Sequence, residues 1–375
     1  MTGEPWTDPR RADVFAMMTG DYPNIGDALI RERVFAWVRD LTDDADVYVG
    51  SAPSQWMERL GVRPFDRVYG TRQIGRWFAA LLRARRPVLV VEPGELDLGP
   101  GVLLRQIAYL AFAVVTRAKG GVVVLPPRAV ARGASGASAA VHRLMCTVAQ
   151  LVWWRNASSV RAIGSGELAP DVAFSEPVYW GGVDEPRTAL VVSMRGPRAW
   201  PGEQWVEAVR TFAHGAGLEV VCVAQVRQDE ERAAELARAL RGTHLAWGET
   251  SDVEHEQILR DLYRRAALTV SDRLHVLILA ALGGAVPVEM APDPAPKVAE
   301  HFATIGYRDL TCDARSATAD RMRAHLAVSL ARTGEIRQAV LAAQRALGEV
   351  ERAVLAAAAV PGVAARPAPR PPAIR

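Results

Sequence analysis

Short apolar runs rich in β-branched residues alternate with longer segments of helical periodicity along most of this chain. Such alternation is typical of α/β units, in which helices connect the strands of a parallel sheet. The expected strands cover residues 13–19, 45–50, 67–70, 87–92, 121–125, 188–193, 218–223, 267–271 and 286–290. The expected helices cover residues 27–40, 72–84, 102–118, 136–150, 202–214, 229–241, 255–265 and 274–282.

One segment rich in proline, glycine and acids, EPVYWGGVDEPR at residues 176–187, breaks this periodicity. We therefore expect two α/β domains, over residues 12–178 and 179–315, with a cleft between them, which is a usual place for ligands. An alanine- and arginine-rich helical extension over residues 316–360 is expected to pack back across the first domain or to mediate oligomerisation. Residues 1–11 form an expected N-terminal tail, and the Pro/Arg-rich residues 361–375 an expected disordered tail.

The most hydrophobic window, residues 103–115, contains Arg105 and is shorter than the roughly 20 residues of a membrane-spanning helix. It predicts a buried helix, with a position near a membrane as a second interpretation. The N-terminus lacks the apolar stretch of a signal peptide. Three cysteines, far apart and without a CxxC pair, predict neither a disulfide framework nor a zinc cluster. These features favour a cytoplasmic protein, with a position at the inner face of the membrane as a second expectation.

The overall charge is nearly balanced, with 45 basic and 42 acidic residues and a formal net charge of +3. Such a balance argues against binding to nucleic acid or to a bilayer through overall charge. Lysine occurs only at Lys119 and Lys297, and all other basic residues are arginine. A coding bias explains this scarcity, but ammonium and guanidinium groups differ in shape and hydration, so each remaining lysine merits a test.

The densest chemical signal is SDRLH at residues 271–275, between an apolar strand and an apolar helix. If the backbone is extended there, Arg273 and His275 project to one side at the carboxyl end of a strand, where open α/β sheets bind ligands. A guanidinium beside an imidazole suits an anionic substrate that must also accept a proton. The structural alternative is that Ser271 or Asp272 caps the helix, Arg273 pairs with a surface acid, and His275 packs without a chemical role.

The turn after the first strand, GDYPNIGDALI at residues 20–30, is the second signal. Gly20 and Gly26 permit a tight backbone, Asn24 can bridge turn amides, and Asp27 is expected to open the following helix. An acid in a cleft accepts hydrogen bonds from sugar hydroxyls or acts as a base. A simple helix cap at Asp27 is an equally good interpretation.

Two further cations follow strands of the second domain. Arg195, in SMRGPRAW, occupies a strand end as Arg273 does, so that the two can clamp one anion, whereas Arg198 is expected to lie on the surface. Lys297 opens an expected helix whose N-terminus would add to an anion site. A plain surface position is the alternative for Arg195 and for Lys297. The remaining histidines show no metal-ligand spacing, and no nucleophile elbow, Walker loop or kinase motif occurs.

The chain resembles the polysaccharide pyruvyl transferase family. The resemblance covers roughly residues 12–310 and rests on five matching segments: NIGDALI, SMR, SDRLHVLILAALGGAVPVEM, Lys297, and RNASSVRAIG with LAPDVAF, which contain Arg155, Ser158, Ser159 and Asp171. It implies a GT-B-like fold of two Rossmann-like domains facing a cleft, with the acceptor on the first and the donor on the second.

The resemblance also implies a reaction. Pyruvate would pass from phosphoenolpyruvate to two hydroxyls of a sugar, without a metal or redox cofactor. Arg195, Arg273 and Lys297 would hold the donor, His275 would act as a general acid, and Asn24, Gly26 and Asp27 would complete the site. The turns VEPGELDLGPG and VVVLPPRAV depart from the glycine-rich turns of many relatives, so the acceptor stays open: a polysaccharide precursor, a glycolipid or a small glycoside.

Two other functions remain as alternatives. A GT-B glycosyltransferase with a nucleotide-sugar donor would bind UDP, whereas a pyruvyl transferase would respond to phosphoenolpyruvate. A catalytically idle sugar-binding protein of the same fold would turn over no donor. Self-association and peripheral membrane association are further expectations about partners.

Overall fold

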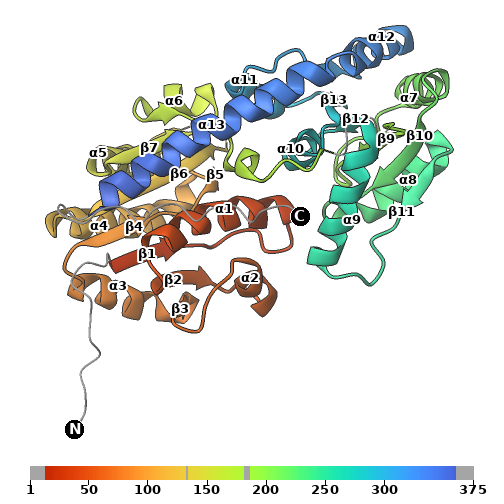
Figure 1. Ribbon diagram of the computed structural model, residues 1–375. Coiled ribbons are helices and arrows are strands. Elements are labelled where there is room, and N and C mark those ends of the chain that lie inside the picture. The colour runs from red at the N-terminus through yellow and green to blue at the C-terminus, as the bar shows by residue number, and fades with distance from the viewer. Residues whose placement is uncertain (1–12, 132–133, 181–185, 360–375) are drawn as a thin grey trace.

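The computed structural model describes residues 13–131, 134–180 and 186–359, so both expected tails lie outside the described residues. Two parallel sheets with helices on their faces form the molecule (Figure 1). The expectation of a GT-B-like fold with two Rossmann-like domains is therefore confirmed.

The first sheet has the strand order β3-β2-β1-β4-β6-β7-β8, and β5 pairs with β6. Its strands are β1 (Asp13–Met17), β2 (Ala45–Gly50), β3 (Arg67–Gly70), β4 (Pro87–Val90), β5 (Gly94–Leu96), β6 (Val122–Val130), β7 (Leu151–Trp154) and β8 (Glu167–Leu168). Its helices are α1 (Ile25–Leu41), α2 (Ser54–Arg59), α3 (Ile74–Arg83), α4 (Leu103–Ala118), α5 (Gly136–Val148) and α6 (Ala157–Ile163). A short 3₁₀ segment, η3 (Val172–Ser175), follows β8.

The second sheet has the order β11-β10-β9-β12-β13-β14. Its strands are β9 (Ala189–Ser193), β10 (Glu219–Val223), β11 (Thr243–Leu245), β12 (Ala266–Ser271), β13 (Val286–Ala291) and β14 (Thr311–Asp313). Its helices are α7 (Glu203–Gly215), α8 (Glu230–Leu240), α9 (Asp252–Arg265), α10 (Leu274–Leu282) and α11 (Pro296–Thr304). The alternation of strand and helix thus predicts most elements, but the short strands β5, β7, β8, β11 and β14 were missed.

The C-terminal helical stretch consists of α12 (Ala319–Leu330) and α13 (Thr333–Ala358). Helix α12 packs on α7 in the second domain, whereas α13 returns to contact α1 and η3 in the first (Figure 1). The buried residues of α13, from Ile336 to Ala358, form one stripe along the helix. This helix therefore ties the two domains together.

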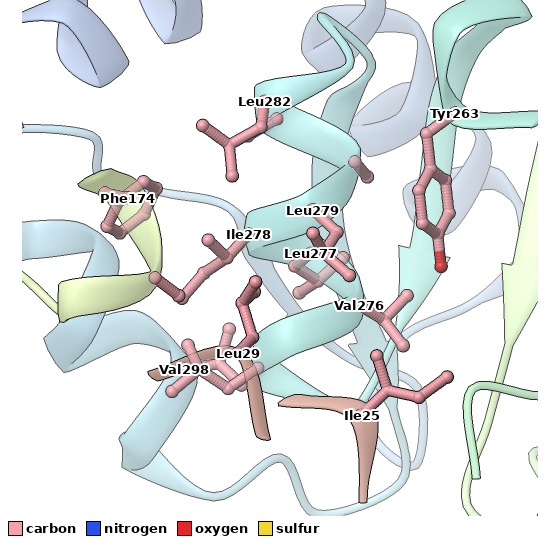
Figure 2. Packing of buried hydrophobic residues seen from close by; sticks show 14 of the residues in the cluster. Ile25, Leu29, Phe174, Tyr263, Val276, Leu277, Ile278, Leu279, Leu282 and Val298 are labelled. Carbon is pink, nitrogen blue, oxygen red and sulfur yellow. The ribbon is translucent and has the colours of Figure 1, made fainter. Parts of the chain in front are cut away.

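Helix α10 is apolar on every side because both domains cover it. Its eight buried residues contact Ile25 and Leu29 of α1, Phe174 of η3, Tyr263 of α9 and Val298 of α11 (Figure 2). A helix that is hydrophobic all round belongs in a core. The first turn of α10 is thereby fixed against the start of α1, across the domain boundary.

Helix α4 corrects one expectation. The sequence predicted a buried helix, but only 28% of the window Pro100–Ala118 is buried in the protein. By length and composition this window is also apolar enough to cross a membrane. Its buried face packs on the first sheet and on α5, and the opposite face is exposed.

Candidate active site

The candidate site lies where the carboxyl ends of strands from both sheets meet the start of α10. His275 is in the first turn of this helix, and its side chain is 14% exposed. The expectation that Arg273 and His275 alternate along an extended segment is wrong, because the helix begins at Leu274 and only Arg273 is extended. Neither Ser271 nor Asp272 is the helix cap, since Arg273 occupies that position. His275 instead faces the first domain.

Two buried side chains of the first domain stand opposite the imidazole. Asp171 Oδ2 is 3.6 Å from His275 Nε2 and 2.7 Å from Arg155 Nη1. Burial raises the pKa of Asp171, but the charges of Arg155 and His275 outweigh burial and hold that pKa well below its usual range. Asp171 is therefore an ionised carboxylate that faces the imidazole ring of His275.

Gly26 makes the approach of His275 to α1 possible. A Cβ atom at this position would lie 2.4 Å from His275 Nδ1 and 2.5 Å from His275 Cβ. Such a separation is far inside van der Waals contact, so any other residue would displace the imidazole. Glycine is thus required at position 26 of the NIGD motif because His275 of the second domain packs against it.

Asn24 and Asp27 organise the turn in front of α1. Asn24 is the N-cap of this helix, and its Oδ1 accepts a 3.0 Å hydrogen bond from the Gly26 amide. The interpretation of Asp27 as the cap is therefore wrong. Asp27 Oδ2 instead accepts from the Asp21 amide at 2.7 Å and pairs with Arg31 Nη1 at 3.0 Å. These contacts give Asp27 a role in the shape of the turn.

The loop after β9 is held by a buried acid. Asp272 Oδ1 accepts from the Arg195 amide at 2.9 Å, and its Oδ2 is 3.4 Å from Arg198 Nε. Arg198, expected on the surface, thus pairs with a buried carboxylate. The Arg195 side chain has a buried Nε without a hydrogen-bond partner among the described residues. Burial lowers the pKa of Arg195, so its charge is poorly solvated and open to an anionic ligand.

Arg273 is positioned by a second buried acid. Its Nε donates to Asp229 Oδ2, while Asp229 Oδ1 accepts from the Gly196 amide at 2.8 Å. Arg273 was expected to pair with an acid on the surface. Its partner Asp229 is instead buried, and it also binds the loop that contains Arg195 and Gly196. Both arginines lie at strand ends of the second sheet, as expected from the sequence.

Lys297 lies in the first turn of α11, as expected, and forms an ion pair across the cleft with Glu95 of β5. Burial raises the pKa of Glu95, but Lys297, Arg155 and Arg195 lower it by more, and the net shift is downward. Burial and the same two arginines lower the pKa of Lys297. Lys297 thus pairs with Glu95, the charges of Arg155 and Arg195 act on the same carboxylate, and Arg155 also pairs with Asp171 opposite His275.

A cavity of about 590 Å³ lies between the two domains, and none of the residues that line it belongs to this cluster. It is lined by the N-terminal part of α1, by α2 and by α9, and includes Tyr22, Ile25, Trp56 and Glu32. Its lining residues Tyr22 and Ile25 flank Asn24 in the turn before α1. The cavity is wide enough for a sugar-sized ligand.

Sequence reasoning did not assign roles to Asp171, Arg155, Glu95 or Asp229, and it considered Asp272 only as a helix cap. Asp171 and Arg155 stood in a segment that the resemblance had pointed to, so a signal for them existed. Asp272 lies inside SDRLH itself. Glu95 lies in the turn VEPGELDLGPG noted above, but Asp229 had no signal, because it meets Arg273 only through the arrangement of distant segments. Within the described residues, no group of three His, Cys, Asp or Glu side chains is placed to hold a metal ion.

A family model described as "Polysaccharide pyruvyl transferase" matches residues 24–288. A search of the curated proteins finds no match.

Several solved structures share the fold. The chain is similar to a putative UDP-N-acetylglucosamine 2-epimerase from Listeria monocytogenes, at 13% identity and a TM-score of 0.56 over 92% of this chain and 95% of that chain. It is also similar to UDP-GlcNAc 2-epimerase from Neisseria meningitidis, at 7% identity and a TM-score of 0.54, over 92% of this chain and 99% of that one. The structure of LpCGTa in complex with UDP aligns at 11% identity and a TM-score of 0.53, with the same coverages of 92% and 99%. At such identities the likeness concerns the fold alone.

Proposed function

The chain belongs to the polysaccharide pyruvyl transferase family, and from this premise we propose that it transfers pyruvate from phosphoenolpyruvate to two hydroxyls of a sugar, forming a ketal and releasing phosphate. The observation that carries the proposal is the convergence of Lys297, Arg155 and Arg195 beside the His275–Asp171 pair. Phosphoenolpyruvate carries a carboxylate and a phosphate close together, which suits several cations around one small volume.

Each cation has a distinct position toward the donor. Among the described residues, Arg195 Nε is buried without a hydrogen-bond partner, and Lys297 lies in the first turn of α11. Arg273 is oriented by Asp229, which leaves the rest of its guanidinium for an anion. In the proposal these three groups bind the phosphate and carboxylate, while Arg155 orients Asp171.

His275 serves as the general acid. It donates a proton to the methylene carbon of the enol, which becomes a methyl group and leaves positive charge at the carbon that bears the phosphate. A sugar hydroxyl forms a bond to this carbon and loses its proton, and the bond to phosphate breaks, with phosphate leaving. A second hydroxyl then closes the ketal at the same carbon and loses its own proton. Asp171 stabilises the protonated imidazole before the transfer.

The acceptor binds from the side of the first domain. Glu95 of β5 pairs with Lys297, and Arg128 of β6 donates to the Glu92 carbonyl. VVVLPPRAV, expected to be a turn, is the buried strand β6, so only VEPGELDLGPG supplies a residue that pairs across the cleft. The interdomain cavity adds carboxylates and the aromatic rings of Tyr22 and Trp56. A polysaccharide precursor, a glycolipid headgroup or a glycoside fits this description.

The test incubates the purified protein with phosphoenolpyruvate and a panel of α- and β-glycosides, and measures phosphate release and the mass gain of a pyruvyl group. We expect His275→Ala to lower kcat by on the order of 100-fold or more with little change in KM. Arg195→Ala and Arg273→Ala are expected to raise KM for phosphoenolpyruvate by roughly 10- to 100-fold. Arg210→Ala, on the exposed surface of α7, is the matched control.

Two results would overturn the proposal. One is equal donor affinity and an unchanged rate in all three site variants. The other is a thermal shift with UDP but none with phosphoenolpyruvate, which would instead support a glycosyltransferase.

A further inference from the structure

The outer surface of helices α3, α4 and α5 combines exposed apolar side chains with many cations. On α4, Leu104 is 82% exposed, and Ile107 and Val114 are each 46% exposed. These positions follow one another at helical spacing, so they form a single stripe along the helix. Leu82 at the end of α3 and Leu144 on α5 are 48% and 53% exposed and flank this stripe. Soluble proteins rarely leave such a contiguous apolar stripe without a partner.

The charges around the stripe all have one sign. The sequence contains no aspartate or glutamate between Asp66 and Glu92, or between Asp97 and Glu167. All three helices fall within these two segments. Exposed arginines on them include Arg76, Arg83 and Arg105. Among the described residues, none of these arginines forms an ion pair with a carboxylate.

The surface has a defined place in the fold. Helices α3, α4 and α5 cover the side of the first sheet that faces away from the second domain (Figure 1). The other face of α4, which includes Tyr109 and Phe112, is buried against the sheet and its neighbouring helices. The helix is therefore part of the folded domain, which leaves one exposed face for a partner.

We propose that the outer face of α3, α4 and α5 is a docking surface for a membrane that contains anionic lipids. Interfacial helices place an apolar stripe at the level of the lipid headgroups and surround it with basic side chains, and this face has both features. Each basic residue near an anionic bilayer adds about 1 kcal/mol to binding. Because both segments lack acidic residues, no carboxylate on these helices would repel the anionic lipid headgroups. The docking surface is independent of the pyruvyl transfer proposed above.

The test is co-sedimentation of the full chain with vesicles. We expect binding to vesicles of phosphatidylcholine mixed with phosphatidylglycerol, weak binding to phosphatidylcholine alone, and a loss of binding at high salt. Replacing three cations together, Arg76→Gln, Arg83→Gln and Arg105→Gln, should weaken binding by on the order of 100-fold. Replacing the stripe with Leu104→Ser, Ile107→Ser and Val114→Ser should weaken it by roughly tenfold or more.

Matched controls lie on the second domain. Val328 on α12 is 66% exposed, and Arg210 and Arg238 are exposed on α7 and α8. The variants Val328→Ser and Arg210→Gln with Arg238→Gln should bind vesicles as the unchanged protein does. Circular dichroism of each variant checks that its fold is retained, which is expected because every replaced side chain is exposed.

Three outcomes would overturn the proposal. The first is equal binding to neutral and anionic vesicles, and the second is binding that neither set of substitutions weakens. The third is a concentration-dependent dimer, without vesicle binding, that the stripe variant abolishes, because the face would then be a contact between two copies of the chain. Vesicle binding needs no turnover, so failure of the pyruvyl transfer assay would leave this test valid.

Discussion

At the scale of single residues, the site depends on side chains that meet across the domain boundary. Gly26 belongs to the first domain, yet the atoms that exclude a side chain from it are those of His275 in the second. Asp171 and Arg155 likewise act on His275 from the opposite domain. The chemistry of the imidazole is therefore set by neighbours far away in the sequence.

Gly26→Ala tests this dependence. The added Cβ would displace His275, so we expect kcat to fall by at least tenfold while the fold remains. His275→Ala in the Gly26→Ala background should cause no further loss beyond that of His275→Ala alone, because the two residues act through one interaction. Steady-state kinetics of the two single variants and the double variant give the answer.

The control is Gly75→Ala on α3, where a Cβ would meet nothing within 4 Å. This variant should keep full activity. Additive losses in the double variant would show that Gly26 acts independently of His275.

Glu289 on β13 gives a prediction about pH. The pKa of this carboxyl is raised from 4.5 to about 7, chiefly by burial and also by Asp272, while Thr311 and nearby arginines act in the opposite direction. The folded protein thus binds this proton more tightly than the unfolded chain does. Its ionisation destabilises the fold as pH rises from about 4.5 to about 7, and the full cost is present above that range.

Glu289→Gln removes the ionisation, so the variant should gain up to about 3 kcal/mol of unfolding free energy relative to the unchanged protein between pH 5 and pH 8. Urea denaturation at both pH values measures the difference. Glu207→Gln, exposed on α7, should show no such gain. Parallel pH dependence of the Glu289→Gln variant and the unchanged protein would contradict the prediction.

At the scale of helices and strands, long elements were predictable and short ones were not. Helix α10 was predicted with its observed bounds because its apolar run is long and lies between a strand and Gly283-Gly284. The three-residue strands β5 and β11 have too few positions to show an alternation, and they exist because the neighbouring strand offers hydrogen bonds. The exposure of α4 was missed because apolar content alone does not reveal which face has a partner.

The candidate site, too, could be predicted only in part. The motifs around His275, Arg195 and Lys297 could be located because each follows a predictable strand. The ion pairs of Lys297 with Glu95 and of Arg273 with Asp229 could not, because those carboxylates lie in segments whose relative position is set by the tertiary fold.

Helix α13 offers a matched pair of leucines on one element. Leu347 is 2% exposed within the buried stripe, whereas Leu341 is 38% exposed. Leu347→Ala should lower the free energy of unfolding by about 2–5 kcal/mol through lost burial and a new cavity. Leu341→Ala should change it by less than about 1 kcal/mol. Equal effects in urea denaturation would mean that α13 does not pack along this stripe.

At the scale of the whole molecule, several polar contacts between described residues join the domains beside the apolar packing of α10. Lys297 pairs with Glu95, Arg59 pairs with Glu256, and Asn156 Nδ2 donates to Glu300 at 2.9 Å. Only the first of these lies among the cations of the candidate site. Glu95 is therefore the counter-charge to these cations, at the place that an anionic donor would take.

Glu95→Gln distinguishes two roles of this carboxylate, the contact between the domains and the competition with an anionic donor. Glutamine keeps the shape but removes the charge that competes with the donor for Lys297, Arg155 and Arg195. We expect KM for phosphoenolpyruvate to fall several-fold, whereas Glu167→Gln, exposed on β8, leaves KM unchanged. The radius of gyration from small-angle X-ray scattering should stay the same, because the other polar contacts and the core around α10 still hold the domains together. A rise in KM together with a larger radius of gyration would instead mean that the Lys297–Glu95 pair is needed to close the cleft.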